Sequence, residues 1–487
     1  MLWGFVVAVF IVPTSLYALS DGRVGLHQRG GMTSFIDQLK SLEGEKTSRL
    51  FNLRRDAAIR FIDSDTIANS PKFPADLQLV FNEIQAQPEQ RVKAYCMSDL
   101  HCDAEKNQRW VKEHCGKSEE DIAENVFSVM IIPGDIGSEV DRIESIFQAM
   151  VESHDAVCYV PGNHEAWRRG TKLGDSTSAT TPELRTSTTT RMSEDSVQKI
   201  VEIVDKAREC GVHTGPVRIV GKEAVSIFPL YSWYHSGWDT EPDLEHEAYR
   251  AVEEAMPFSR KWGDFSMCTW PTDLLPEHQD FASTDVDRDS TVLALAWASL
   301  NEPFLAPVTS SSAHRISTGG GRDRPPRVSE RDTVLSFSHF IPRQELLPEK
   351  RFLTEPLLTR VVGSDPLEAQ IRRLRPHLHL FGHSHVPVDL EVEGIRYVQW
   401  PLGYSREANM QCAPMRRHGN LMVYDSDLVG EESLAYQGVP RSMPSLECAW
   451  SEYYRSQPRQ PGVIGPLAPW VMQRLEQFSG FVKREGP

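Results

Sequence analysis

The residues of this chain with the clearest capacity for chemistry are histidines, aspartates and one asparagine that follow short apolar runs. Five runs end in the segments SDLH, PGD, PGNHE, SHF and GHSH. Imidazole and carboxylate ligands together suit transition metals such as Mn, Fe or Zn, whereas Mg²⁺ and Ca²⁺ prefer mostly oxygen. The candidate metal ligands in these segments are Asp99, His101, Asp135, Asn163, His339, His383 and His385.

This set has more ligands than one tetrahedral ion needs, so it predicts two ions of higher coordination number that share a carboxylate. Two ions about 3.5–4 Å apart generate hydroxide near neutral pH and stabilise an in-line displacement at phosphorus. Each segment alone also fits a polar turn without chemistry, but five such segments in this order favour the metal site. His314 is an alternative to His339, and the apolar run LSFS before His339 favours His339.

The apolar runs predict the elements that bring these ligands together. VMIIP and AVCYV are apolar at nearly every position, as expected of strands buried on both faces. Between them, Val140, Ile143, Phe147 and Met150 fall on one helical face, so the order strand, helix, strand predicts an α/β sheet. Ligand sites in open α/β sheets lie beyond the carboxyl ends of the strands, so we expect all five segments in one crevice.

The same patterns predict the domain organisation. Apolar residues at three- and four-residue spacing predict a helical N-terminal extension over residues 21–90. A catalytic domain is expected over residues 91–430, with insertions at about 171–196 and 236–330 and a low-complexity, disordered stretch at 309–330. A turn at Gly221-Lys222 is expected to join two further strands, and residues 431–487 are expected to form a tail.

Charge and the N-terminus limit the partners and the location. A net charge of −16 argues against a surface for nucleic acid, although a small phosphorylated substrate still fits. Residues 1–20 hold an apolar run too short to span a bilayer, which fits a signal peptide or a mis-called start upstream of Met32. We favour an intracellular soluble protein, with a secretory or organellar location as the alternative, and the sequence predicts no oligomeric state.

The five segments resemble those of the calcineurin-like metallophosphoesterases, in that family's order, from about residue 93 to residue 404. The stretches FSHFIPRQELLPEKR and PLYSWYHSGWDTEPD are similar to plant- and alga-type members. The resemblance implies an α/β fold in which a β-sandwich is flanked by helices, with a dimetal site at the carboxyl-terminal edge of the strands.

The resemblance also implies individual roles. Asp99, His101, Asp135 and His385 would bind the first metal, Asp135 would bridge, and Asn163, His339 and His383 would complete the second metal site. His164 would not be a ligand. It would protonate the leaving oxygen or stabilise the transition state while a hydroxide bridging the metals attacks phosphorus, a task that suits an imidazole.

One departure from the Ser/Thr protein phosphatase branch shapes the expected substrate. Ser138 stands where that branch has an aspartate that orients the catalytic histidine, and Glu139 or Glu165 is a candidate replacement. We therefore expect a small-molecule phosphomonoesterase or phosphodiesterase.

Three residues outside the five segments are candidate substrate contacts. Arg168 could bind a phosphate oxygen or lie in a solvated loop. Trp233 and His235 in YSWYH could line the pocket or pack in an aromatic core.

Two other classes of protein stay open at this point. One is a non-catalytic binding scaffold on the same fold, which the complete set of ligand residues disfavours. The other is a mononuclear zinc hydrolase of another fold, although the chain has no HExxH motif.

Overall fold

The structure is a computed structural model that describes residues 66–67, 72–73, 77, 79–168, 195–272, 274, 291–305, 332–407, 413–429, 435–436, 439–440 and 448–485. The expectations for residues 1–20, for most of the insertion at about 171–196 and for the stretch 309–330 lie outside the described residues.

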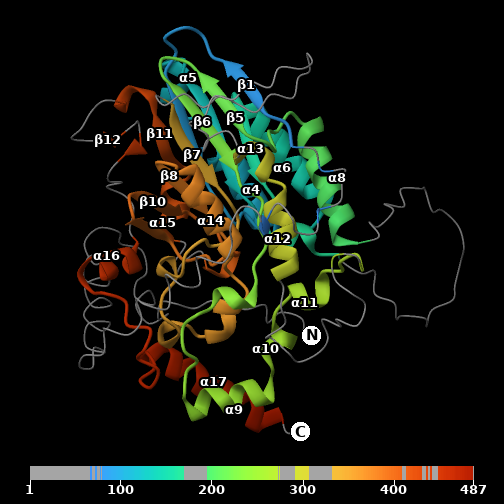
Figure 1. Cartoon of the computed structure of the whole chain (residues 1–487), viewed down its shortest axis with the longest axis vertical. Coiled ribbons are helices and arrows are strands. Elements are labelled where there is room, and N and C mark those ends of the chain that lie inside the picture. Colours follow the sequence, from blue (N-terminus) through green and yellow to red (C-terminus); the bar gives the residue numbers. More distant parts are fainter. Residues whose placement is uncertain are drawn as a thin grey trace, which may run out of the picture.

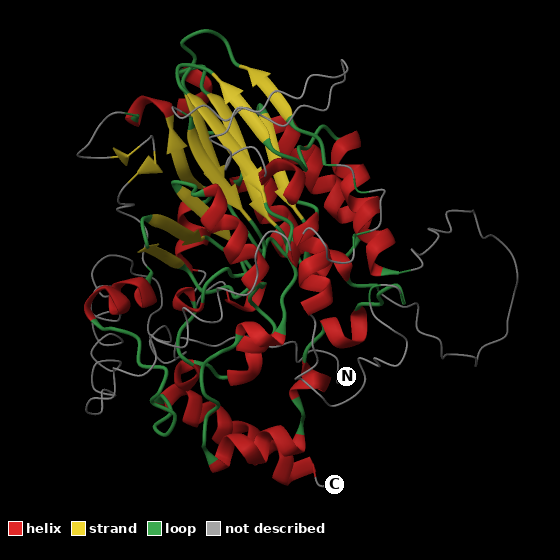
Figure 2. Cartoon of the chain, viewed as in Figure 1, coloured by secondary structure: helices red, strands yellow, loops and turns green. Residues whose placement is uncertain are grey.

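The chain forms a mixed α/β fold in which parallel and antiparallel sheets are flanked by helices (Figures 1 and 2). The strands of the larger sheet are, in spatial order, β1 (Asn82–Gln85), β5 (Val217–Val220), β6 (Ala224–Pro229), β7 (Thr333–Phe337), β8 (Leu378–Phe381), β10 (Ile395–Gln399) and β9 (Val388–Val392). Those of the smaller sheet are β11 (Leu421–Asp425), β2 (Val92–Cys96), β3 (Phe127–Pro133) and β4 (Ala156–Val160). A separate two-stranded pair is formed by β12 (Ala435–Tyr436) and β13 (Val439–Pro440).

The strands that precede the five predicted segments run parallel within each sheet. β2, β3 and β4 are parallel neighbours, and so are β7 and β8. Every residue of β3 and β4 is buried, as their apolar sequences predict, and a single core cluster contains side chains from both sheets. The carboxyl ends of these parallel strands therefore lie at a common edge of each sheet.

Helices pack around the sheets, and further helices lie in the insertion that begins at residue 236. The helix between β3 and β4 is α6 (Val140–Ser153). Of the face predicted for it, Ile143, Phe147 and Met150 are buried and Val140 is partly buried. The other α-helices in the described part of the chain are α4 (Glu105–His114), α5 (Glu119–Ala123), α7 (Asn163–Ala166), α8 (Ser196–Glu209), α9 (Glu247–Ala255), α10 (Phe258–Lys261), α11 (Asp264–Met267), α12 (Thr291–Ser299), α13 (Glu302–Leu305), α14 (Asp365–Leu374), α15 (Ala413–His418), α16 (Ala449–Ser456) and α17 (Pro469–Glu485).

The structure corrects one prediction at the N-terminal side. The helical extension expected over residues 21–90 is wrong for residues 82–85, which form the edge strand β1 and pair in parallel with β5. An edge strand with one exposed face needs few apolar residues, so its sequence pattern is easily mistaken for a polar helix. By contrast, β5 and β6 form the predicted pair of strands on either side of Gly221-Lys222.

The segment after residue 447, for which no role was predicted, packs against the rest of the molecule. The Trp470 indole N–H donates to the carbonyl oxygen of Phe352 at 3.0 Å. Arg459 Nη1 donates to the buried Glu241 carboxylate at 2.5 Å, and α17 lies beside α9 (Figure 1). The C-terminal segment is therefore attached to the insertion that begins at residue 236.

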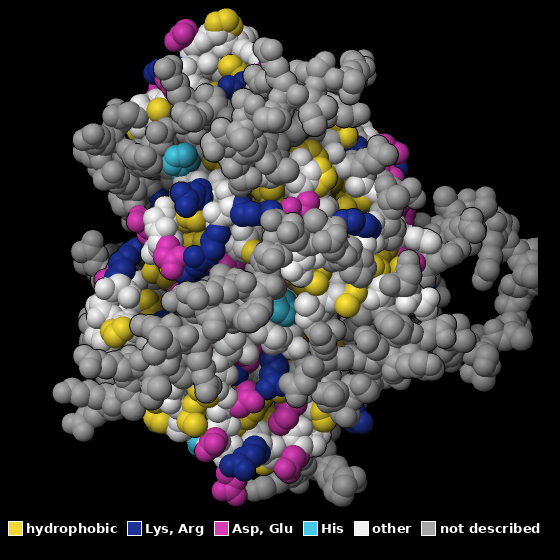
Figure 3. All heavy atoms as spheres, in the orientation of Figure 1, with side chains coloured by type: hydrophobic (Ala, Val, Ile, Leu, Met, Phe, Trp, Pro, Cys, Tyr) yellow, Lys and Arg dark blue, Asp and Glu magenta, His cyan; other side chains and the backbone are white. Residues whose placement is uncertain are grey.

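The surface carries mixed charge on the face shown in Figure 3. Basic and acidic side chains lie next to one another in the region of α14, where ion pairs such as Arg372–Glu393 at 2.8 Å occur. None of the helices in the described part of the chain combines the length and apolarity needed to cross a bilayer.

Candidate metal centre

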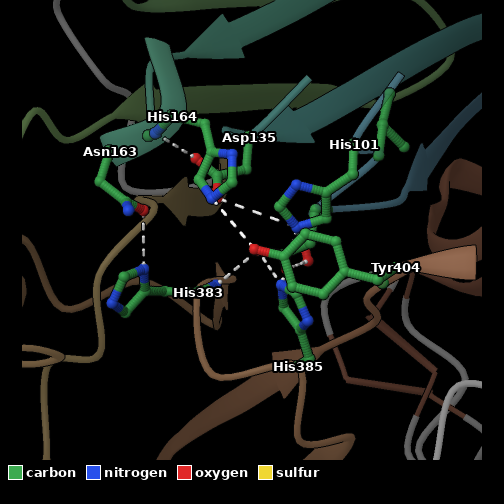
Figure 4. A network of polar contacts seen from close by, with 12 residues as sticks. His101, Asp135, Asn163, His164, His383, His385 and Tyr404 are labelled. Atoms are coloured by element: carbon green, nitrogen blue, oxygen red, sulfur yellow. Dashed lines mark hydrogen bonds and ion pairs between the residues drawn. The ribbon is translucent and has the colours of Figure 1, made fainter. Parts of the chain in front are cut away.

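The ends of five strands bring the predicted ligands into one place (Figure 4). Asp99 and His101 follow β2, Asp135 follows β3, Asn163 and His164 begin α7 after β4, His339 follows β7, and His383 and His385 follow β8. All of these side chains are buried. Three groups have ligand atoms within 4.8 Å of one another: Asp99, His101 and His385; Asp135, His339 and His383; and His101, Asp135 and His164.

The backbone at these strand ends adopts a conformation that most residues avoid. Asp99, His101, Asp135, His383 and His385 have φ values of 54°, 45°, 55°, 77° and 55°. The left-handed region costs an L-residue roughly 1–2 kcal/mol, and such residues gather at functional sites. Hydrogen bonds between the loops hold this arrangement, for example from the His383 N–H to Asp99 Oδ1 at 2.8 Å.

In the group formed by Asn163, His339 and His383, each residue has one hydrogen-bond acceptor atom that faces the other two. The Nδ1 atom of His339 lies 3.0 Å from the Pro133 carbonyl oxygen, and Nε2 of His383 lies 3.0 Å from that of Val361. A carbonyl oxygen only accepts hydrogen bonds, so these two ring nitrogens carry the hydrogens.

In the neutral rings, the other nitrogen of each histidine (Nε2 of His339 and Nδ1 of His383) therefore carries a lone pair and no hydrogen. Burial lowers the pKa of His339 to about 4 and lowers the pKa of His383 well below its usual value. His339 Nε2, His383 Nδ1 and Asn163 Oδ1 lie 3.0–3.1 Å apart. Three acceptors at this separation have no hydrogen to share, and a bound cation would satisfy all three.

The group formed by Asp99, His101 and His385 is built in a similar way. Nδ1 of His385 donates to Glu407 Oε2 at 2.9 Å, so that in the neutral ring Nε2 carries the lone pair. That Nε2 lies 2.8 Å from His101 Nε2 and 3.6 Å from Asp99 Oδ1. These groups could hold metal ions.

Asp135 lies between the two groups. Its Oδ1 is 3.4 Å from His339 Nε2 and its Oδ2 is 4.0 Å from His101 Nε2. Burial and the neighbouring Glu165 and Asp99 carboxylates raise the pKa of Asp135 well above its usual value. An anion in this place is unfavourable without a compensating cation, so the electrostatics also fit a metal site.

His164 faces the same space but its contacts differ from those of the other histidines. Its Nε2 lies 3.1 Å from the Tyr404 hydroxyl and 3.8 Å from Asp135 Oδ2 (Figure 4). Its ring stacks on Trp167 with centroids 3.6 Å apart. Packing and a hydroxyl group thus fix the orientation of this imidazole.

The two carboxylates considered as orienting groups for His164 make other contacts. Glu165 accepts hydrogen bonds from the backbone N–H groups of Asp135, Ile136, Gly137 and Gly162. Glu139 pairs with Arg142 at 2.7 Å. Glu165 therefore ties the loops after β3 and β4 together, and the Tyr404 hydroxyl contacts the His164 ring.

A cavity opens beside these residues. Asp135, Asn163, His164, His383 and His385 line it together with Trp167, Trp262, Leu358 and Tyr404. The two indoles, Leu358 and Tyr404 were absent from the predicted site. Trp262 and Leu358 lie outside all five motifs, so no local pattern indicated them.

The three residues predicted as substrate contacts, Arg168, Trp233 and His235, do not line this cavity. Trp233 packs among Trp270, Trp297 and Phe340, with ring centroids 4.8–5.6 Å apart. His235 lies 3.4 Å from the Asp365 carboxylate, and the Arg168 backbone N–H donates to the Met267 carbonyl at 2.7 Å. Of the two alternatives given for Trp233, the structure shows packing in a buried aromatic cluster.

Comparison with known proteins adds little to this geometry. No protein-family model and no curated protein sequence matches the chain. Among solved structures, the chain is similar to the phosphopantetheinyl hydrolase PptH from Mycobacterium tuberculosis, with a TM-score of 0.46 and 17% identity. The match covers 69% of this chain and 96% of that chain.

Proposed function

We propose that the protein is a dimetal phosphoesterase that hydrolyses a phosphomonoester or phosphodiester, and that its two sheets form the expected sandwich. The observation that carries the proposal is the set of three converging acceptors on Asn163, His339 and His383 beside the buried Asp135 carboxylate. Nitrogen and oxygen donors in this mixture suit Mn, Fe or Zn.

The chain's residues would divide into two sets of ligands. Asp99, His101 and His385 would hold one ion, Asn163, His339 and His383 the other, and Asp135 would bridge them. Ions bound there would neutralise phosphoryl charge and lower the pKa of water, so that a nucleophile is present near neutral pH.

His164 and Tyr404 would handle the proton at the leaving oxygen. His164 Nε2 faces the cavity and would donate a proton to the departing alkoxide or phenoxide. Tyr404 would hold the ring through its hydroxyl and add a hydrogen-bond donor for a phosphoryl oxygen. The Trp167 and Trp262 side chains would keep water away from the reacting groups.

The test combines metal content with turnover. Purified protein should contain about two transition-metal ions per chain and hydrolyse p-nitrophenyl phosphate or bis-p-nitrophenyl phosphate. The preferred ester separates monoesterase from diesterase activity. Asp135→Asn should lose both metal and turnover. A wild-type protein that binds two ions but hydrolyses neither ester would favour a scaffold, and one that binds no metal would refute the proposal.

A further inference from the structure

The insertion supplies a buried carboxylate that contacts the candidate metal centre from outside the five motifs. Asp264 begins α11, and its residue is 2% exposed. Its Oδ1 accepts hydrogen bonds from Asn163 Nδ2 at 2.8 Å and from the Trp167 indole N–H at 2.5 Å. Its Oδ2 accepts from the Trp262 indole N–H at 2.9 Å. Asp264 thus links the asparagine to both indoles that line the cavity.

The insertion is attached to the loop of Asn163 by backbone contacts as well. The Arg168 N–H donates to the Met267 carbonyl at 2.7 Å. Gly263 lies so close to Trp167 that a Cβ atom there would be 2.8 Å from the indole ring. Only glycine permits this approach, so the position of Asp264 relative to Asn163 is set by packing on both sides.

The chemistry of the contact determines which end of the Asn163 amide faces the histidines. The two ends of a side-chain amide are nearly equal in size, and hydrogen-bond partners decide their orientation. Indole N–H groups only donate, and one reaches each Asp264 oxygen, so both oxygens act as acceptors. Nδ2 of Asn163 must therefore face Asp264, and Oδ1 must face His339 and His383 at 3.1 and 3.0 Å.

We propose that Asp264 is a positioning residue for the second metal site, because it holds the Asn163 carbonyl oxygen toward His339 and His383. This inference rests on the proposed dimetal function. Without Asp264 the amide can rotate about its last bond and present its NH₂ group to the ion. A residue that orients a metal ligand without binding the metal itself typically changes the metal affinity by about 10- to 100-fold when it is removed.

A double-mutant cycle on the full chain tests the inference with Mn²⁺ alone as the probe. Metal-stripped wild type, Asp264→Ala, Asn163→Ala and the double variant are titrated with Mn²⁺ up to millimolar concentration against a competing chelator. We expect Asp264→Ala to weaken one of two Mn²⁺ sites by about 10- to 100-fold. In the Asn163→Ala background the same substitution should have almost no further effect, because its action passes through the amide.

A matched variant separates positioning from general support of the fold. Ser266→Ala removes an exposed hydroxyl of the same helix, which donates to the Gly263 carbonyl at 3.1 Å, and leaves the contact of Asp264 with Asn163 in place, so it should keep both Mn²⁺ affinities. Equal weakening by Ser266→Ala and Asp264→Ala, or additive effects in the cycle, would overturn the inference.

The remaining outcomes distinguish this inference from the proposed function. Wild type that binds no Mn²⁺ defeats both. Wild type with two sites and Asp264→Ala with unchanged affinities defeats only the role of Asp264. If Asp264→Ala does not fold, Asp264→Asn takes its place in the cycle, because its amide has an acceptor on one end only and should still weaken the same site.

Discussion

The contact between His385 and Glu407 allows a quantitative prediction about metal affinity. Glu407 Oε2 accepts hydrogen bonds from His385 Nδ1 at 2.9 Å and from the Tyr404 backbone N–H at 2.8 Å. The other oxygen, Oε1, has no hydrogen-bond partner among the described residues. Because both bonds end on one oxygen, a glutamine can keep both and lose only the negative charge.

The two substitutions Glu407→Gln and Glu407→Ala should therefore differ in size. A hydrogen bond to a charged group contributes about 1.5–3 kcal/mol and a neutral one about 1 kcal/mol. Glu407→Gln should then lose about 1–1.5 kcal/mol, or about tenfold in metal affinity. Glu407→Ala loses the partner altogether and frees the ring, so we expect about 3 kcal/mol, or about 100-fold.

The assay is a competitive Mn²⁺ titration of metal-stripped protein against a chromophoric chelator. Glu391→Ala is the control, because Glu391 is an exposed residue of β9 and its loss should leave the affinity unchanged. The reasoning fails if Glu407→Ala binds Mn²⁺ as tightly as wild type, or if the glutamine variant is weaker than the alanine variant.

Three further predictions concern catalysis and stability. His164→Ala should lower kcat on an aryl phosphate by about 10²- to 10⁴-fold with metal content unchanged, and normal turnover would remove His164 from the mechanism. Tyr404→Phe should lower kcat by about fivefold through loss of one hydrogen bond of about 1 kcal/mol to His164, and an unchanged pH profile and kcat would argue against this contact. Asp121→Asn should destabilise the fold by about 3 kcal/mol at pH 7 in urea unfolding, because it leaves the buried Lys93 charge without its partner at 2.7 Å. Burial raises the pKa of Asp121, but hydrogen bonds from Lys93 and Tyr95 outweigh burial and lower the pKa overall. The stabilisation is therefore present above the pKa of an unfolded aspartate and is lost as the pH falls through the lower pKa of the folded state. A difference in stability between wild type and Asp121→Asn that persists in full at pH 2 would contradict the assignment.

The sequence could predict the parts of the candidate site where local pattern and chemistry coincide. Asp135 and His383 each follow a completely buried strand after one glycine, so the sequence pattern places each at the carboxyl end of its strand. The two strands lie in different sheets, so the packing of the two sheets brings these residues together. Asp264, Tyr404 and Glu407 could not be found in this way. Asp264 is 101 residues from Asn163 in the chain, and no period or motif marks it.

Aromatic residues show a second limit of sequence reasoning. Trp233 and Trp262 both lie in aromatic-rich sequence after β6, and nothing local distinguishes a core ring from a cavity wall. The structure places Trp233 against Trp297 and places Trp262 in the cavity lining, with its N–H on Asp264. Only the tertiary arrangement of the insertion separates the two cases.

The attachment of the C-terminal segment bears on the order in which the protein is assembled during synthesis. Glu241 and its partner Arg459 are 218 residues apart in the chain. The last metal-ligand candidate, His385, leaves the ribosome several seconds before Arg459 at about 5–20 residues per second. The strand-end loops and the insertion residue Asp264 are therefore synthesised before the contact between Arg459 and Glu241 can form, so the insertion receives its C-terminal attachment last.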